Sequence, residues 1–107
     1  MRNSNLDCKK VALDIRNYVD TQRNYRNPSL TSADVASAIG ISRTSLSKVM
    51  REEMNTTFLQ YIDNLRLRHA HRIISTKDSY DPEHVALLVG FATVRTFKEK
   101  YKKTYGI

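Results

Sequence analysis

The longest helical pattern in the chain runs from Phe58 to Ser75, a stretch with neither glycine nor proline. Its apolar residues recur mostly at spacings of three and four, which is typical of a helix with buried faces. Thr57 stands just before it, where an N-cap belongs. Arg66 lies among the apolar positions, so we expect its charge to be satisfied inside the protein. The pattern predicts one long helix, with a similar small motif on each side of it.

Three shorter helical patterns precede this helix. Cys8 to about Gln22 carries an apolar stripe, and a polar connection over 23–28 follows it. We then expect a short helix over 33–39, with Ser32 as its N-cap. Gly40 ends that helix by taking the left-handed conformation. A helix over 43–53, N-capped by Ser42, completes a helix-turn-helix pattern; its inward residues are Leu46, Val49 and Met50, and Asn55 ends it.

The same pattern returns after the long helix. Asp81 followed by Pro82 is a strong helix start, and Gly90 ends that short helix. A last helix is expected from Thr93 to about Thr104, with Phe97 and Tyr101 buried and Gly106 as its stop. The two copies align at an offset of 50 through Ser42 and Ala92, and at 51 from Leu46 and Phe97 onward. This change of offset predicts one inserted residue at the start of the last helix.

The predicted fold is all-α. One domain over 1–107 would hold a first helix-turn-helix unit over about 8–55, a linker helix over about 57–75 and a second unit over about 81–107.

Composition narrows the class of function. The 107 residues carry a net charge of +7, which favours acidic partners, with nucleic acid the first candidate. The single cysteine, Cys8, excludes an internal disulfide and suits a reducing compartment; we expect a cytoplasmic protein. No apolar run approaches the ~20 residues that span a membrane, and no signal peptide precedes the first helix, so no membrane partner is expected.

Catalysis finds no support in the sequence. His69 and His71 are two residues apart on the predicted helix, so they point to different sides and do not chelate one metal easily. There is no glycine-rich phosphate loop and no nucleophile motif. We expect no enzyme activity, no metal and no cofactor.

Two groups of residues resemble the DNA-binding domain of the AraC/XylS family of bacterial transcription regulators, a homeodomain-like arrangement. The first lies in the long helix and the second follows it; they are Tyr61-Ile62, Leu65-Arg66-Leu67, Ala70 and Ile73-Ile74, and then Val85-Ala86, Val89-Gly90-Phe91, Phe97, Tyr101-Lys102-Lys103 and Gly106. The resemblance implies that two helix-turn-helix units bind adjacent major grooves on one face of double-stranded DNA. It also implies that the helices over 43–53 and 93–104 read the bases.

Further expectations concern partners and departures from the family pattern. RNA polymerase is a second candidate partner. The isolated domain is expected to be monomeric. Two origins of the chain stay open: a fragment of a larger regulator, whose full-length parent would dimerise through a further domain, and a small stand-alone family member, which its length also suits. The first reading helix carries the small residues Ser45 and Ser47, and Pro82 stands where the family usually has an aliphatic residue.

Candidate DNA contacts follow from the outer faces of the two reading helices. Base contacts are expected from Arg43, Thr44, Ser47, Lys48, Thr93, Val94, Arg95, Lys98 and Glu99. Phosphate contacts are expected from Ser32, Ser42, Arg51, Lys100, Lys102 and Lys103.

Several alternatives stay open at this point. These residues also fit ordinary solvated helix faces, and Val94 also fits the core. Glu99, which aligns with Lys48, also fits an intrahelical pair with Arg95 or Lys103. The rival function is a helical protein-interaction module that has lost sequence-specific DNA binding.

Overall fold

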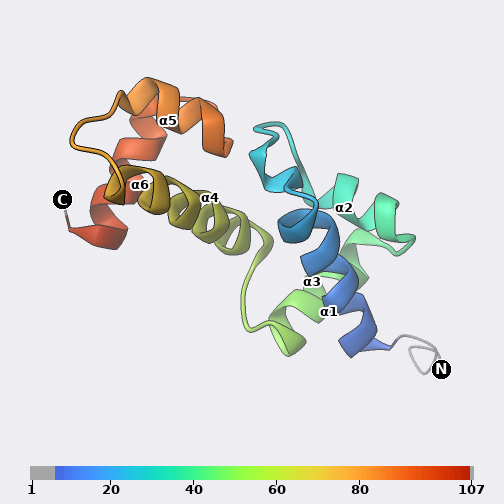
Figure 1. Ribbon diagram of the computed structural model, residues 1–107. Coiled ribbons are helices and arrows are strands. Elements are labelled where there is room, and N and C mark those ends of the chain that lie inside the picture. The colour runs from blue at the N-terminus through green and yellow to red at the C-terminus, as the bar shows by residue number, and fades with distance from the viewer. Residues whose placement is uncertain (1–6, 107) are drawn as a thin grey trace. The chain divides into compact units, whose positions relative to one another are not determined.

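The computed structural model describes residues 7–106. Within that range it is all-α, as predicted, and contains no strand (Figure 1). The chain divides into two compact units. One consists of the residues up to Asn24 together with Leu30–Tyr61, and the other of Tyr25–Ser29 together with the chain from Ile62 onward. The helical elements in order are α1 (Cys8–Arg16), η2 (Asn17–Thr21), η3 (Asn24–Arg26), α2 (Ser32–Ile39), α3 (Arg43–Glu53), α4 (Phe58–Ser75), α5 (Pro82–Val89) and α6 (Val94–Tyr105).

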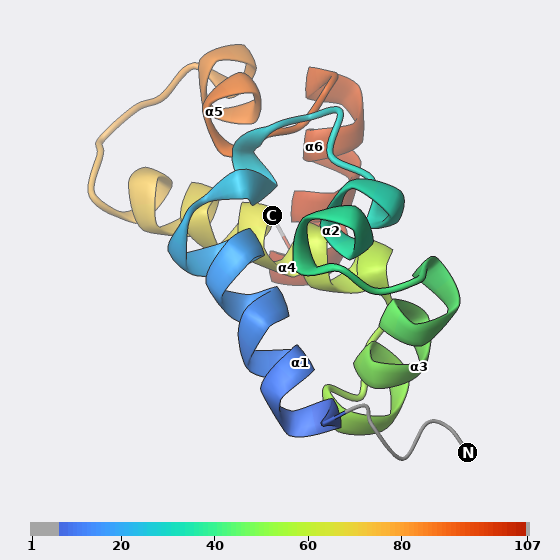
Figure 2. The same cartoon turned by 90° about the vertical axis from the view of Figure 1, so that its right-hand side faces the viewer.

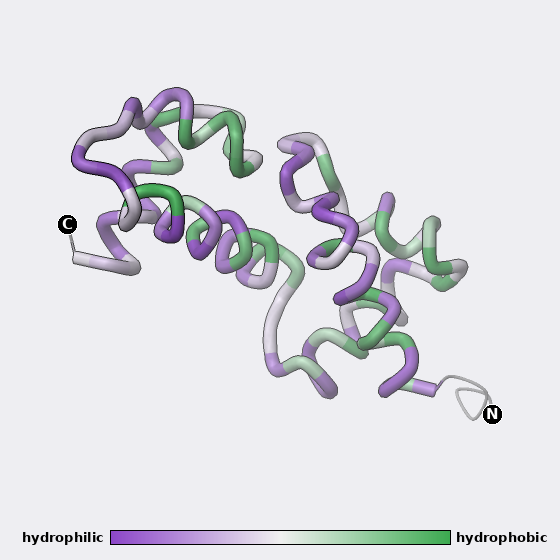
Figure 3. The backbone as a smooth tube through the Cα atoms, viewed as in Figure 1, coloured by the Kyte–Doolittle hydropathy of each residue, from purple (hydrophilic) through white to green (hydrophobic). Residues whose placement is uncertain are grey.

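The first unit is built from α1, α2 and α3, which pack against one another (Figure 2). The helix predicted over 8–22 is α-helical only to Arg16 and then widens into the π-helical turn η2. Apolar residues alternate with polar ones along these helices (Figure 3), so each presents one face to a common core. The buried residues of that core are Val11, Ala12, Ile15, Val19, Val35, Ala36, Leu46, Val49 and Met50.

The start of α2 differs from the prediction. Thr31, not Ser32, is the N-cap: its Oγ1 accepts a hydrogen bond from the Asp34 N–H at 3.1 Å. The Asp34 carboxylate in turn accepts from the Thr31 N–H at 3.0 Å. This reciprocal capping box satisfies two helix-terminal donors. Serine is a somewhat better N-cap than threonine by propensity, but the acidic residue three positions after Thr31 completes the capping box and decides for Thr31.

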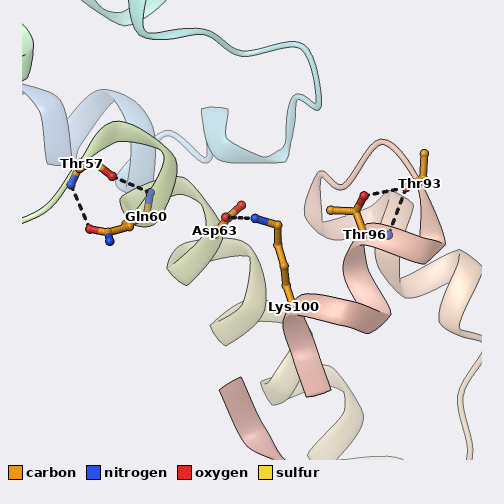
Figure 4. Close-up of polar contacts among 6 residues, drawn as sticks. All are labelled: Thr57, Gln60, Asp63, Thr93, Thr96 and Lys100. Atoms are coloured by element: carbon orange, nitrogen blue, oxygen red, sulfur yellow. Dashed lines mark hydrogen bonds and ion pairs between the residues drawn. The ribbon is translucent and has the colours of Figure 1, made fainter. Parts of the chain in front are cut away.

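The long helix α4 has the predicted bounds, Phe58–Ser75. Thr57 caps it: its Oγ1 accepts from the Gln60 N–H at 3.2 Å, and the Gln60 Oε1 accepts from the Thr57 N–H at 3.4 Å (Figure 4). The first residues of α4 belong to the first unit and the rest, from Ile62, to the second.

The second unit packs α5 and α6 against the larger part of α4. Three aromatic rings form the centre of its core: Phe91 and Phe97 lie 5.6 Å apart, and Phe97 and Tyr101 lie 5.5 Å apart, between ring centroids. The other buried members of this cluster are Leu67, Ala70, Val85, Ala86 and Val89.

The segment Tyr25–Ser29 also belongs to the second unit, although the sequence predicted only a polar connection there. Tyr25 is 3% exposed, and its hydroxyl lies 3.0 Å from Nδ1 of His69. Its backbone carbonyl accepts from Nε of Arg66 at 2.7 Å, and the carbonyl of Asn27 accepts from Nη2 at 2.9 Å. This segment is therefore anchored on the second unit by a buried guanidinium.

Arg66 is satisfied inside the protein, as predicted, and its hydrogen-bond partners are the backbone carbonyls of Tyr25 and Asn27. Its guanidinium also lies 5.8 Å from the centre of the Phe91 ring. Burial lowers the pKa of Arg66, and the negative charge of Asp63 partly offsets that effect. An arginine remains charged under such conditions, so its two carbonyl partners are needed to hold that charge in a buried site.

Candidate nucleic-acid interface

The turn before α3 places the N-terminus of that helix at the surface. Gly40 adopts the left-handed conformation with φ of 88°. Ser42 then caps α3, its Oγ accepting from the Ser45 N–H at 3.0 Å, as predicted. Because Leu46, Val49 and Met50 are fully buried, the opposite face of the helix is left to solvent.

The predicted base-reading residues of α3 lie on that outer face. Arg43, Thr44 and Ser47 are exposed, whereas Lys48 is half-buried. A lysine can bury its aliphatic stem and still present its ammonium group to solvent. The helix therefore offers one arginine, one lysine and two short hydroxyl side chains near its N-terminus.

In α6 the predicted start was wrong by one residue. Thr93 is the N-cap and precedes the helix, which begins at Val94. The Thr93 Oγ1 accepts from the Thr96 N–H at 3.2 Å and donates to the Thr96 Oγ1 at 3.0 Å (Figure 4). A hydroxyl occupied in this way is less available to a base than the sequence suggested.

The outer face of α6 is the more strongly charged of the two. Arg95, Lys98 and Glu99 are exposed. Val94 is partly buried and packs against the second-unit core, which is the alternative that the sequence left open. The base-reading candidates of this helix are thus mainly two cations and one carboxylate.

The two turns are equivalent, with one difference in length. The N–H of Ile41 bonds to the carbonyl of Ala36 at 3.0 Å, and the N–H of Phe91 bonds to that of Ala86 at 2.9 Å. The offset of 50 therefore holds up to Phe91. The caps Ser42 and Thr93 are then offset by 51.

The inserted residue consequently lies in the turn, before the cap, and not at the start of the helix as predicted. Sequence alignment matched Ser42 with Ala92, but the hydrogen bonds match it with Thr93. The second turn is longer and contains Phe91, which is 2% exposed.

One equivalent position carries opposite charges. Lys48 and Glu99 each stand six residues after their cap, Ser42 or Thr93. Glu99 lies 3.7 Å from Nε of Arg95, and both side chains are largely exposed, at 67% and 87%. An exposed pair of this kind contributes only a few tenths of a kcal/mol to the helix, so it leaves Glu99 free to meet another partner.

The candidate phosphate contacts are not all alike. Arg51, Lys102 and Lys103 are exposed, and Ser42 lies at the N-terminus of α3. Ser32 is not a cap, and the acidic side chain of Asp34 lies in the same first turn of α2.

Lys100 differs from the other lysines because it is paired. Its Nζ lies 2.5 Å from Oδ2 of Asp63 on α4 (Figure 4). Asp63 was not among the predicted site residues, and no local signal points to it, because 37 residues separate it from Lys100.

Residues 7–106 contain no group of three or more His, Cys, Asp or Glu side chains that could hold a metal ion. None of the helices in this range is both long enough and apolar enough to cross a membrane.

Comparison with known proteins agrees with this architecture. A solved transcriptional regulator from Chromobacterium violaceum, described as having an AraC-type DNA-binding domain, superposes with a TM-score of 0.77; the match covers 96% of this chain and 88% of that one, at 20% identity. The family model "Helix-turn-helix domain" matches residues 35–107. The chain belongs to the AraC-type helix-turn-helix family of transcription regulators.

Two curated relatives place this AraC-type chain among regulators. It is 27% identical to the probable transcription factor PqrA of Proteus vulgaris over 98 residues, 92% of this chain and 79% of that protein. It is 31% identical to the HTH-type transcriptional regulator GlxA of Rhizobium meliloti over 71 residues, 66% of this chain but only 22% of that protein.

The function of the AraC-type chain is sequence-specific DNA binding in transcription regulation. The rival function, an interaction module without DNA binding, is not favoured. Its family consists of DNA-binding regulators, which are not enzymes.

Proposed function

We propose that the chain binds double-stranded DNA as a monomer, with α3 and α6 each entering one of two successive major grooves. One observation carries the proposal: two helices of one chain follow a left-handed glycine turn, are N-capped by a hydroxyl and expose a polar outer face. A reading helix contacts base edges with such a face, near its N-terminus.

In α3 the base contacts come from Arg43, Thr44, Ser47 and Lys48. Arg43 is the first helical residue and can donate two hydrogen bonds to guanine O6 and N7. Lys48 lies about one and a half turns further along, so its ammonium meets a neighbouring base pair. The hydroxyls of Thr44 and Ser47 suit either a donor or an acceptor.

In α6 the main base contacts are Arg95, Lys98 and Glu99. Glutamate accepts hydrogen bonds but cannot donate them, so Glu99 favours cytosine N4 where Lys48 favours guanine. Val94 adds a methyl contact for thymine beside its core packing, and Thr93 acts through the helix N-terminus that it caps. The two half-sites on DNA are therefore expected to differ in sequence.

Phosphate contacts fix the register of both helices. The N-terminus of α3, capped by Ser42, offers backbone N–H groups and the positive end of the helix dipole. Arg51, Lys102 and Lys103 supply exposed cations. Ser32 is a weaker candidate because Asp34 opposes an approaching phosphate.

We further propose that the protein acts in the cytoplasm, together with the DNA that it binds. RNA polymerase is the proposed second partner, since a bound regulator acts on transcription by meeting or excluding polymerase.

Gel-shift titration of the purified chain on duplexes selected from random DNA tests the proposal. Arg95→Ala is expected to weaken binding to the selected site by about 1–3 kcal/mol and to relax preference at one position. Arg72→Ala, which removes an exposed arginine of α4 outside the reading helices, is the matched control and should leave that preference unchanged. Equal loss in both variants, or no preferred sequence at all, would contradict the proposal.

A further inference from the structure

The ion pair between Lys100 and Asp63 sets this lysine apart within α6. Lys100 stands between the exposed Glu99 and the buried Tyr101, and its side chain is 35% exposed. The Asp63 side chain that binds it is only 14% exposed. By contrast, Lys98, Lys102 and Lys103 of the same helix are exposed.

In the first unit the position equivalent to Lys100 is apolar. The residue there, at an offset of 51, is Val49, which is 0% exposed in the core beneath α3. In the second unit a lysine stands at that position, and α4 supplies a carboxylate to receive it. The ion pair therefore packs α6 against α4 at the position where an apolar side chain packs α3 into its core. It also holds a cation beside the reading face of α6.

Asp63 also stands close to a second cation. Arg66 follows it by three residues on α4, and the negative charge of Asp63 acts against the lowering of the Arg66 pKa by burial. Substitution of Asp63 by a neutral residue would leave Lys100 without its observed carboxylate partner. The long side chain could then swing toward solvent, where DNA phosphates would lie.

We propose that Asp63 is a positioning residue for DNA recognition that withholds the charge of Lys100 from the phosphate backbone. The inference rests on the proposed role of α6 as a reading helix. Its consequence is specificity: a lysine on phosphate strengthens binding to every sequence equally. The paired lysine does not contribute to the affinity for random DNA. The base contacts of α6 therefore make up a larger share of the total affinity than they would if Lys100 bound a phosphate.

The salt dependence of binding measures this effect directly. Each lysine that neutralises a phosphate of duplex DNA releases counterions and steepens the plot of log affinity against log salt by about 0.9. A merely structural role of the pair would alter affinity or stability without changing that slope. The probe is a random-sequence duplex, titrated with the 107-residue chain between 50 and 200 mM salt.

Lys100→Met is expected to keep the slope of the parent chain, because the charge that it removes is already neutralised. Asp63→Asn is expected to steepen the slope by about 0.9, so its gain in affinity over the parent is about 3.5 times larger at 50 mM than at 200 mM salt. The double variant should return to the parent slope. Asp78→Asn removes an exposed carboxylate of the second unit and should leave the slope unchanged.

A shallower slope in Lys100→Met would overturn the inference, since Lys100 would already be on phosphate. A steeper slope that persists in the double variant, or that appears equally in Asp78→Asn, would also overturn the inference. An unchanged slope in folded Asp63→Asn would do the same. If circular dichroism shows Asp63→Asn unfolded, Lys100→Met and the double variant decide by the same slopes. A parent chain that fails to bind DNA would instead refute the proposed function.

Discussion

The two equivalent glycines of the helix-turn-helix turns should respond very differently to alanine. Gly40 and Gly90 both have a left-handed backbone, with φ of 88° and 112°. A Cβ atom on Gly40 would meet nothing within 4 Å. A Cβ atom on Gly90 would lie 2.4 Å from the carbonyl oxygen of Tyr25, 2.8 Å from Nε of Arg66 and 2.9 Å from Cα of Arg26.

The magnitudes follow from these distances. Gly40→Ala carries only the strain of a left-handed alanine, about 1–2 kcal/mol. Gly90→Ala carries that strain and also forces the segment beginning at Tyr25 away from the Arg66 guanidinium. Loss of one charge-assisted hydrogen bond adds about 1.5–3 kcal/mol, for a total of about 2.5–5 kcal/mol. That is a large part of the ~5–15 kcal/mol that stabilises a typical domain.

Urea unfolding followed by far-ultraviolet circular dichroism measures both losses. The expected result is a loss in Gly90→Ala at least about 1.5 kcal/mol larger than in Gly40→Ala. Equal losses would contradict this prediction, because they would mean that the segment Tyr25–Ser29 moves away from Gly90 at no cost in free energy. Arg66→Met, which keeps an unbranched apolar stem but removes the guanidinium and both of its hydrogen bonds, should make the difference between the two glycine variants smaller.

Three further predictions concern α6. Phe97→Ala should lower the free energy of unfolding by about 3–5 kcal/mol in the same assay, because the ring is 1% exposed in the second-unit core; a change below about 0.5 kcal/mol would place the ring outside the core. Burial raises the pKa of the Tyr101 hydroxyl, and the nearby phenols of Tyr80 and Tyr105 add to the rise. The folded state then keeps the proton that the unfolded chain loses near pH 10, so the free energy of unfolding is highest below about pH 10 and decreases above it. Urea unfolding from pH 8 to about 11 should show a smaller decrease in this free energy for Tyr101→Phe than for the parent chain. An identical decrease in both would contradict the raised pKa. Glu99→Lys should raise affinity for random DNA and change base preference at one position of one half-site, as measured by selection from random DNA. If the variant selects the same site as the parent and only binds every sequence more strongly, Glu99 does not contact a base.

Local signals were sufficient to predict much of this molecule. The bounds of α4 follow from its unbroken apolar spacing and from Thr57, and the starts of α3 and α5 from Ser42 and from Asp81 before Pro82. Each of these signals acts within one helical turn, which is why a single sequence reveals it.

The features that the sequence did not reveal depend on distant contacts. Tyr25 and Arg66 are 41 residues apart, and the sequence near either residue does not indicate that the two are in contact. Asp63 and Lys100 are 37 residues apart. Arg66 among apolar residues did indicate an internal partner, but the backbone carbonyls that satisfy it have no sequence signature.

Errors of one residue had a different cause. Thr31 and Ser32 are both good N-caps, and propensity alone does not choose between them. At the last helix the repeat alignment matched Ala92 with Ser42, although the good N-cap is the next residue, Thr93. The position of the inserted residue in the second turn depends on the same choice. Hydrogen bonds to Asp34 and Thr96 settle both cases.

Footprinting of the chain on its selected duplex shows directly whether α3 and α6 both read DNA. We expect one protein per duplex and two short protected blocks on one face of the DNA, about 10 base pairs apart and different in sequence. Lys48→Ala should weaken protection of one block and Arg95→Ala that of the other. A single block, or two proteins on the shortest bound site, would contradict the claim that α3 and α6 of one chain read two grooves.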